Sequence, residues 1–206
     1  DITSLPEFQQ ADVIHLHWIN QGMLSLKDIQ KIIDSGKPVV WTMHDMWPIT
    51  GICHHAQDCT KYQTQCHTCP LLYKGYKHDL SYRVFLKKQK LYKKANITFV
   101  ACSQWLEGLA KHSVLALGHT VTNIPNPINT NLFRPLNKTQ VRNSLNLPTD
   151  KKLLLFSSMK ITDPKKGIDY LVEACKLIQK NHPDFCNSLG VVVVGKESQQ
   201  YADLFP

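Results

Sequence analysis

The chain has 206 residues, of which 43% are hydrophobic and 19% charged, an ordinary globular composition with enough apolar material for one or two domains. It contains neither a run of about 18 apolar residues nor a charged-then-apolar leader, so we expect no membrane span and no signal peptide in this sequence. Residue 1 is Asp rather than Met, from which we expect the natural protein to be longer.

The net charge is +8, from 24 Lys and Arg against 16 Asp and Glu. Much of the excess falls in residues 74–95, which hold eight basic residues and one acid, with Tyr and Phe interleaved. Such a stretch predicts contact with nucleic acid, an anionic membrane surface or a phosphorylated substrate. The alternative is a solvated helix face.

In chain order, the first half alternates between apolar strand patterns and amphipathic helix patterns. Ser25 is the expected N-cap of the first helix, and Gly36 followed by Pro38 ends it. The continuous apolar run after Pro38 is typical of a strand buried on both faces of a parallel sheet. The alternation predicts a doubly wound sheet. The expected strands are 11–18, 39–44, 96–103 and 119–125, and the expected helices are 25–35, 80–95 and 104–112.

The second half restarts this pattern after residues 123–138, which hold three prolines and five asparagines and read as a linker. A strand, a helix and a strand then follow at residues 152–159, 166–182 and 189–196. The fold class is therefore α/β with two Rossmann-like domains, joined near Pro125. We expect both to be incomplete: residues 1–124 lack the start of the first domain, and residues 125–206 hold the linker and the first part of the second.

Histidines follow two of the expected strands of the first domain at their carboxyl ends. His15 and His17 are two apart on one strand and should point the same way, and His44 with Asp45 follows the next strand. Ligands of open parallel sheets bind at this edge, so these residues are candidates for a site. The alternative is that each is a structural histidine with satisfied hydrogen bonds.

Seven cysteines, an odd number, predict reduced thiols in a reducing compartment. Cys102, at the end of a strand, and Cys175, within a helix, are expected to be packing residues. Four further cysteines cluster within 17 residues, with one C-x₂-C pair and gaps of five and six residues. This spacing suits a closed structural zinc site or a cluster of thiols or disulfides; a catalytic metal is a third alternative, but four thiolates would close its open position. The four cysteines are Cys53, Cys59, Cys66 and Cys69, and His54, His55 and His67 are available substitutes.

Lysines surround the start of the helix expected in the second domain. Lys160, Lys165 and Lys166 lie beside the positive end of this helix, and Gly167 allows close approach of the backbone. The pattern predicts an anion site, or alternatively a solvated basic turn. No G-x-x-x-x-G-K-[ST] motif is present, which excludes a nucleoside triphosphatase loop.

Together these motifs resemble family-four retaining glycosyltransferases of the GT-B fold, above all bacterial enzymes that build capsule, exopolysaccharide or lipopolysaccharide O-chains. The resemblance covers nearly the whole chain. The motifs are "DVIHLHW", "GKPVVWTMHDMWPITGICHH" with the cysteines that follow, "NIPNPINTNLFRP" and "KKGIDYL".

The resemblance implies an enzyme of the hexosyltransferase type. It would move a sugar from a nucleotide-sugar donor to a glycan or polyprenyl-linked acceptor in cell-surface polysaccharide synthesis, with retention and without a catalytic cofactor. It also implies a cytoplasmic protein at the inner face of the membrane, with residues 74–95 as the peripheral contact and no nucleic-acid partner. Two Rossmann-like domains would face each other across a cleft.

Site residues follow from the resemblance by position. His44 would contact the transferred sugar, and Lys160 and Lys166 would grip the donor diphosphate; these three are the catalytic candidates. The substrate-binding candidates are His17, Asp45, Asn126 and Gly167. The sequence departs from the family's pattern at three points. Pro127 replaces the glycine of the hinge motif, and both the glycine-rich loop and the E-x₇-E pair of the family are absent from this sequence.

Two other classes of protein compete with this interpretation. A zinc-containing basic nucleic-acid-binding protein would explain the cysteines and the net charge, although the basic residues are scattered through a two-domain α/β pattern. A metal-dependent hydrolase would use His15, His17 and His44 as ligands, with Asp45 as the only evident base.

Overall fold

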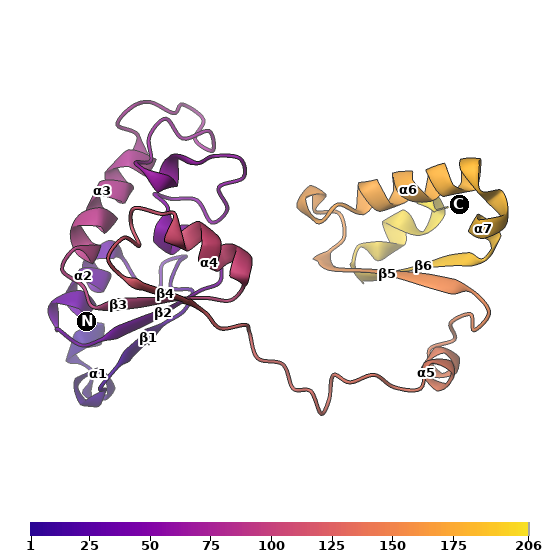
Figure 1. Ribbon diagram of the computed structural model, residues 1–206, viewed down its shortest axis with the longest axis horizontal. Coiled ribbons are helices and arrows are strands. Elements are labelled where there is room, and N and C mark those ends of the chain that lie inside the picture. The colour runs from indigo at the N-terminus through magenta and orange to yellow at the C-terminus, as the bar shows by residue number, and fades with distance from the viewer. Residues whose placement is uncertain (206) are drawn as a thin grey trace. The chain divides into compact units, whose positions relative to one another are not determined.

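The computed structural model describes residues 1–205, apart from the side chain of Ala202. The chain forms two compact units, Asp1–Ile128 and a second that begins at Asn129. Each unit contains its own parallel sheet, four-stranded in the first and two-stranded in the second (Figure 1). Mixed α/β structure with parallel sheets agrees with the Rossmann-like character expected from the sequence.

The sheet of the first unit is built by three consecutive β-α-β connections, as the alternation of sequence patterns predicted. Its strands are parallel throughout and lie in chain order. They are β1 (Ile14–Leu16), β2 (Val39–Met43), β3 (Ile97–Ala101) and β4 (Thr120–Asn123), and the connecting helices are α2 (Leu26–Asp34), α3 (Leu80–Tyr92) and α4 (Gln104–Lys111).

A doubly wound sheet reverses its strand order once, at a switch point. The four strands of the first unit follow one another without such a reversal in the part of the chain that the structure describes. Because one half of a doubly wound sheet has this same order, the doubly wound sheet stays a prediction. Figure 1 shows α3 and α4 on the same side of the sheet, as successive right-handed crossovers in one direction require.

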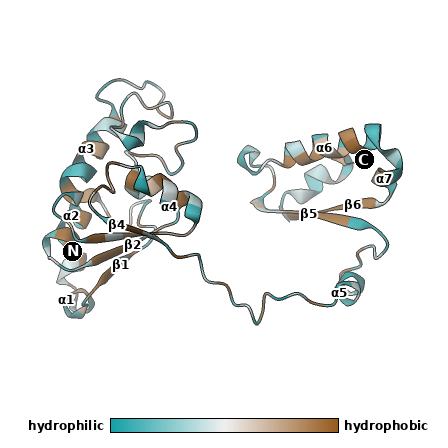
Figure 2. Cartoon of the chain, viewed as in Figure 1, coloured by the Kyte–Doolittle hydropathy of each residue, from teal (hydrophilic) through white to brown (hydrophobic). Residues whose placement is uncertain are grey.

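The core lies on one face of this sheet. In β2 the alternate residues Val39, Trp41 and Met43 are buried, whereas Val40 and Thr42 between them are half-buried. The expectation of a strand buried on both faces is thus wrong, although the strands stand out as hydrophobic in Figure 2. The indole of Trp41 is 1% exposed and contacts aromatic rings of three other elements, at centroid distances of about 6 Å.

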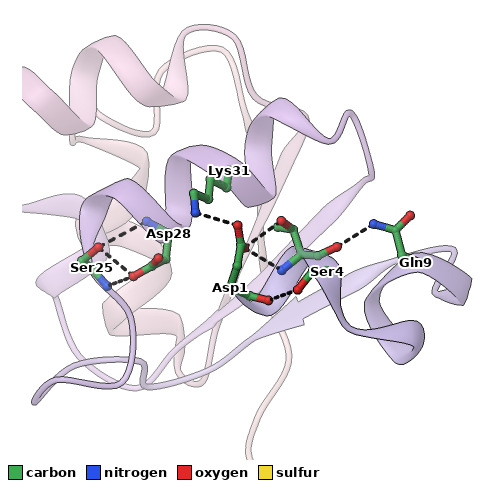
Figure 3. Close-up of polar contacts among 7 residues, drawn as sticks. Asp1, Ser4, Gln9, Ser25, Asp28 and Lys31 are labelled. Carbon is green, nitrogen blue, oxygen red and sulfur yellow. Dashed lines mark hydrogen bonds and ion pairs between the residues drawn. The ribbon is translucent and has the colours of Figure 1, made fainter.

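The start of α2 is fixed by the cap that the sequence predicted. The Ser25 hydroxyl accepts from the Asp28 N–H, and the Asp28 carboxylate accepts from the Ser25 N–H at 2.9 Å, which completes a capping box (Figure 3). The same helix holds the beginning of the chain, because Lys31 pairs with Asp1 at 2.6 Å. A short helix, α1 (Pro6–Gln10), comes soon after Asp1 in the chain; the sequence patterns did not predict it.

The second unit has few buried side chains. Its elements are α5 (Lys138–Ser144), β5 (Lys152–Lys160), α6 (Ile168–Asn181), α7 (Pro183–Asn187) and β6 (Leu189–Lys196). Ile168, Val172 and Cys175 of α6 are buried together with Ile161, which bears out the packing role expected for Cys175. Apolar side chains such as Leu155 and Val194 are exposed on the sheet.

Gly51 marks the closest approach of the loop after β2 to α3. A Cβ at this position would lie 2.5 Å from the carbonyl oxygen of Ser81 and 3.1 Å from Cβ of Cys66. Because the nearest obstacle is backbone, it cannot rotate away as a flexible side chain would. The loop and the first turn of α3 are therefore packed against each other without room for a methyl group.

We expect Gly51→Ala to lower the free energy of unfolding by about 1–3 kcal/mol, the usual range for overpacking. Gly108→Ala is the matched control, since its Cβ would meet nothing within 4 Å. Within α4 that control should be neutral or stabilising by up to about 1 kcal/mol, because Ala is the better helix former. Urea denaturation of both variants measures the difference, and equal effects would contradict the close packing.

Candidate functional site

The carboxyl edge of β1 and β2 brings together the residues that the sequence marked there. Nδ1 of His17 lies 3.1 Å from Nε2 of His44, and the two rings are stacked at 5.4 Å. An imidazole–imidazole hydrogen bond needs one N–H and one lone pair, so this contact is lost when both rings are protonated. A small hollow at this edge is lined by His17, Trp41, His44 and their neighbours.

His15 lies on the same side of the strand as His17, as their spacing predicted, with ring centroids 4.2 Å apart. Its Nε2 is hydrogen-bonded to the hydroxyl of Thr42 at 2.9 Å. Burial, and then the charge of His17, lower the pKa of His15. His15 is thus a structural partner of β2, while His17 joins His44.

Asp45 has both carboxylate oxygens engaged. Oδ1 accepts from the backbone N–H of Trp47 at 2.8 Å, and Oδ2 accepts from Nε1 of Trp18 at 2.9 Å and from Nδ1 of His54 at 2.7 Å. The two rings that donate to Oδ2 come from segments far apart in the sequence. Asp45 therefore organises this edge, a role that its position after β2 did not reveal.

The turn that follows Asp45, η2 (Trp47–Ile49), is held from α3 by Lys88. The Lys88 ammonium donates to the carbonyl oxygens of Trp47 at 2.5 Å and Thr50 at 3.0 Å, and lies 3.3 Å from the centre of the Trp47 indole. Tyr92, one turn further along α3, donates its hydroxyl to the carbonyl of Pro48 at 3.1 Å. Two residues of one helix face thus fix the loop that carries the site.

Lys88 is fully buried, so the solvated helix face considered as an alternative for residues 74–95 does not include this residue. Burial lowers its pKa well below the ordinary value, against the opposing charges of Cys66, Cys53 and Asp45. The signal was present in the sequence, because Phe85, Lys88 and Tyr92 fall on one helical stripe. A lysine within an apolar stripe needs acceptors in the core, and here they are carbonyl groups of the turn.

The other seven Lys and Arg residues of 74–95 are exposed. Asp79, the single acid, is buried at the N-cap of α3, where it accepts from the Tyr82 N–H. Burial opposes ionisation of Asp79, but hydrogen bonds from the Cys69 N–H and the Ser81 hydroxyl leave its pKa lowered. The exposed Lys, Arg, Asp and Glu residues of this stretch are therefore all basic, and the neighbouring Tyr73 is 98% exposed.

All seven cysteines lie in the described residues and are free thiols. Burial raises the pKa of Cys66 to about 11; the Gly51 N–H, 3.3 Å from its sulfur, opposes this, and the charges of Cys53, Cys59 and Cys69 add to it. The four clustered thiols are thus near enough to influence one another. Within residues 1–205, however, no three His, Cys, Asp or Glu side chains are grouped as metal ligands.

The histidines considered as substitute zinc ligands have other partners. His54 donates to Asp45, the ring of His55 stacks on Trp105 at 5.6 Å, and Nδ1 of His67 lies 3.2 Å from the Thr68 hydroxyl. The structure therefore assigns these three rings to polar and aromatic contacts. The grouping of His15, His17 and His44 that a metal-dependent hydrolase would need is likewise not found as a ligand set in the described part of the chain.

In the second unit, Lys165 and Lys166 are exposed in the turn η4 (Pro164–Lys166), and Gly167 follows in the left-handed region at φ 78°. In the described residues no side chain caps α6, so its first N–H groups lack a side-chain acceptor there. Lys160 pairs with Glu197 at 3.6 Å, and the Thr162 hydroxyl donates to the same carboxylate. These contacts lower the pKa of Glu197, the hydrogen bond from Thr162 most.

Glu197 was not identified from the sequence, because it lies 37 residues from Lys160 and adjoins β6 rather than β5. Asn126, the remaining candidate, is exposed in the irregular segment between β4 and α5. No contact joins it to the other candidates among the hydrogen bonds of residues 1–205. The structure therefore groups His17, His44 and Asp45 in the first unit, and Lys160, Lys166 and Gly167 at one end of β5 and α6 in the second.

Comparison with known proteins gives one informative match. The chain is 32% identical over 89 residues to a protein described as "Putative colanic acid biosynthesis glycosyl transferase WcaC" from Escherichia coli (strain K12). The match covers 39% of this chain and 22% of that protein, so it spans less than a quarter of the relative's length. No family model matches the chain.

Among the residues described, none of the helices combines the length and the apolar character needed to cross a bilayer.

Lys88→Met tests the buried ammonium that fixes the turn. We expect the free energy of unfolding to fall by about 2–4 kcal/mol, because the carbonyls of Trp47 and Thr50 lose their donor inside the protein. Lys87→Met, at an exposed neighbouring position of the same helix, should change stability by less than about 0.5 kcal/mol. Chemical denaturation of the two variants measures their free energies of unfolding. Equal decreases in the two variants would show that the Lys88 contacts are not stabilising.

Proposed function

We infer that this chain belongs to a glycosyltransferase, of the family-four GT-B type, that moves a sugar from a nucleotide-sugar donor to a glycan or polyprenyl-linked acceptor with retention. The observation that carries this proposal is the match to the E. coli relative, whose name specifies glycosyl transfer in colanic acid biosynthesis. Two parallel α/β units and a polar cluster at the carboxyl edge of the first sheet support it. Capsule or lipopolysaccharide synthesis is the process in which we expect it to act.

The chemistry requires stabilisation of a leaving nucleoside diphosphate, whose negative charge grows as the glycosidic bond breaks. Lys166 and the open N-terminus of α6 supply a cation and unpaired N–H groups at one place. The net positive charge at Lys160 is smaller than the sequence alone implies, because the Glu197 carboxylate lies 3.6 Å from the Lys160 ammonium and offsets it. Lys166 is therefore the stronger candidate for the contact with the diphosphate. Gly167, which has no side chain, allows the backbone at this position to approach the diphosphate closely.

In the first unit, His44 is the candidate for contact with the transferred sugar, and His17 fixes its ring through their hydrogen bond. Asp45 acts beside them through Trp18 and His54, rather than with a free carboxylate. These roles need no metal ion in the chemical step.

The exposed basic surface of residues 74–95 supports peripheral contact with an anionic membrane, where a polyprenyl-linked acceptor would be presented. A basic nucleic-acid-binding protein would use the same surface. Titration of the protein with anionic vesicles and with duplex DNA separates the two proposals.

Replacement of Lys166 by Ala in the full-length protein should lower the rate of sugar transfer about 30- to 1000-fold, which corresponds to roughly 2–4 kcal/mol of lost transition-state stabilisation. Lys180→Ala, at an exposed position in the last turn of α6, is the matched control and should leave the rate unchanged. Both variants should keep the melting temperature of the parent. His44→Ala should reduce transfer more than it reduces binding of the bare nucleoside diphosphate.

Transfer rates and nucleoside-diphosphate affinities of these variants are the measurements. If Lys166→Ala binds the nucleotide and transfers sugar at the parent rate, the anion site is wrong and the proposal loses its chemical basis.

The structural zinc site predicted from Cys53, Cys59, Cys66 and Cys69 stays a prediction. In such a site the four sulfurs would each lie about 2.3 Å from one zinc ion. Protein purified without chelator should contain about one equivalent of zinc by elemental analysis, and a strong chelator should lower its melting temperature. Protein free of zinc, with a melting temperature that does not respond to chelator, would exclude the site.

A further inference from the structure

Trp18 and His54 form an exposed pair on the Asp45 carboxylate. The indole N–H and the imidazole Nδ1 both bond Oδ2 of Asp45, and the ring centroids are 6.1 Å apart. Trp18 is 43% exposed and the His54 side chain 49%, while the carboxylate beneath them is only 20% exposed. One nitrogen of each ring, Nε1 of Trp18 and Nδ1 of His54, is thus hydrogen-bonded to the same carboxylate, and about half of each side chain remains exposed to solvent.

Asp45 also fixes which nitrogen of His54 carries hydrogen. A carboxylate can only accept, so Nδ1 holds the hydrogen of the neutral imidazole and Nε2 keeps a lone pair. Nε2 is therefore a hydrogen-bond acceptor of defined orientation on a side chain that is 49% exposed.

His55, the next residue, provides a contrast within the same chain. The Gln57 N–H donates to Nδ1 of His55 at 3.0 Å, so its hydrogen lies on Nε2. Its ring stacks on Trp105, which is 57% exposed. Within residues 1–205 two exposed Trp–His pairs are thus found, and of these two the pair on Asp45 offers an imidazole lone pair.

We propose that Trp18 and His54 bind the acceptor sugar, with a pyranose ring against the indole face and the reacting hydroxyl donating a hydrogen bond to Nε2 of His54. An apolar ring face suits the C–H groups of a pyranose, a directed acceptor suits one hydroxyl, and the Asp45 charge disfavours an anionic ligand. Trp18 follows His17 and Asp45 follows His44, so the acceptor would lie beside the residue assigned to the transferred sugar. The proposal rests on the proposed function and locates the acceptor within it.

The first experiment measures the tautomers of the two histidines by ¹⁵N-detected NMR of the imidazole rings above pH 7.5. Hydrogen on Nδ1 of His54 and on Nε2 of His55 is the expected result, with the His54 preference lost in Asp45→Ala. Hydrogen on Nε2 of His54 overturns the proposal, whatever the activity of the protein.

The second experiment measures transfer by the full-length protein from nucleotide-sugar donors to methyl pyranosides of glucose, galactose and mannose. His54→Asn keeps a donor for Asp45 but removes the outer acceptor, and should raise the acceptor KM at least tenfold while the donor KM stays within twofold. Trp18→Ala should act in the same direction. His54→Gln should recover part of the loss, because its amide reaches the position of Nε2.

His55→Asn and Trp105→Ala are the matched controls and should stay within twofold of the parent in both KM values. The proposal fails if these controls lose as much as the test variants, or if His54→Asn and Trp18→Ala leave the acceptor KM unchanged. Donor hydrolysis without transfer to any pyranoside also overturns the acceptor site, but leaves glycosyl transfer standing.

If the donor does not react at all, the proposed function fails instead. Saturation-transfer NMR with the same pyranosides then decides the sugar site alone: contacts that Trp18→Ala removes support it, and their absence in the parent overturns it.

Discussion

The site depends on one buried charge. The Lys88 ammonium reaches from α3 into the core, where the carbonyl oxygens of Trp47 and Thr50 and the Trp47 ring replace its water. Taking an ammonium group out of water is costly, so it remains there only while these partners stay in place. The turn Trp47–Ile49 is thereby held against α3, and the Trp47 N–H is presented to Asp45.

The position of this turn in turn fixes side chains at the edge of the sheet. Asp45 is fixed by the Trp47 N–H and in turn orients Trp18 and His54. His17 and His44, each next in sequence to a member of this group, share a hydrogen bond at the ends of β1 and β2. A rigid parallel sheet sets the spacing of these strand ends, so a polar cluster can be held with little freedom at the surface.

The second unit follows a different principle. Its lysines stand on a turn and at a strand end, and Glu197 pairs with one of them, Lys160. Lys165 and Lys166 are exposed, and among the described residues no side chain caps the start of α6. An anion site of the kind proposed for these residues would gain strength from its ligand more than from its own packing.

The sequence by itself determined the order of strands and helices, the Ser25 cap and the position of the histidines at the strand ends, because these depend on local periodicity and on neighbouring residues. Only the tertiary structure decided that Lys88 is buried, that Glu197 meets Lys160, and that one face of the first sheet carries the core. His54 and His55 make the distinction sharpest. They are the same residue type at adjacent positions, yet a carboxylate from another segment accepts from one and a backbone N–H donates to the other. The position of an imidazole hydrogen is set by the partner it meets in space, and sequence alone does not specify that partner.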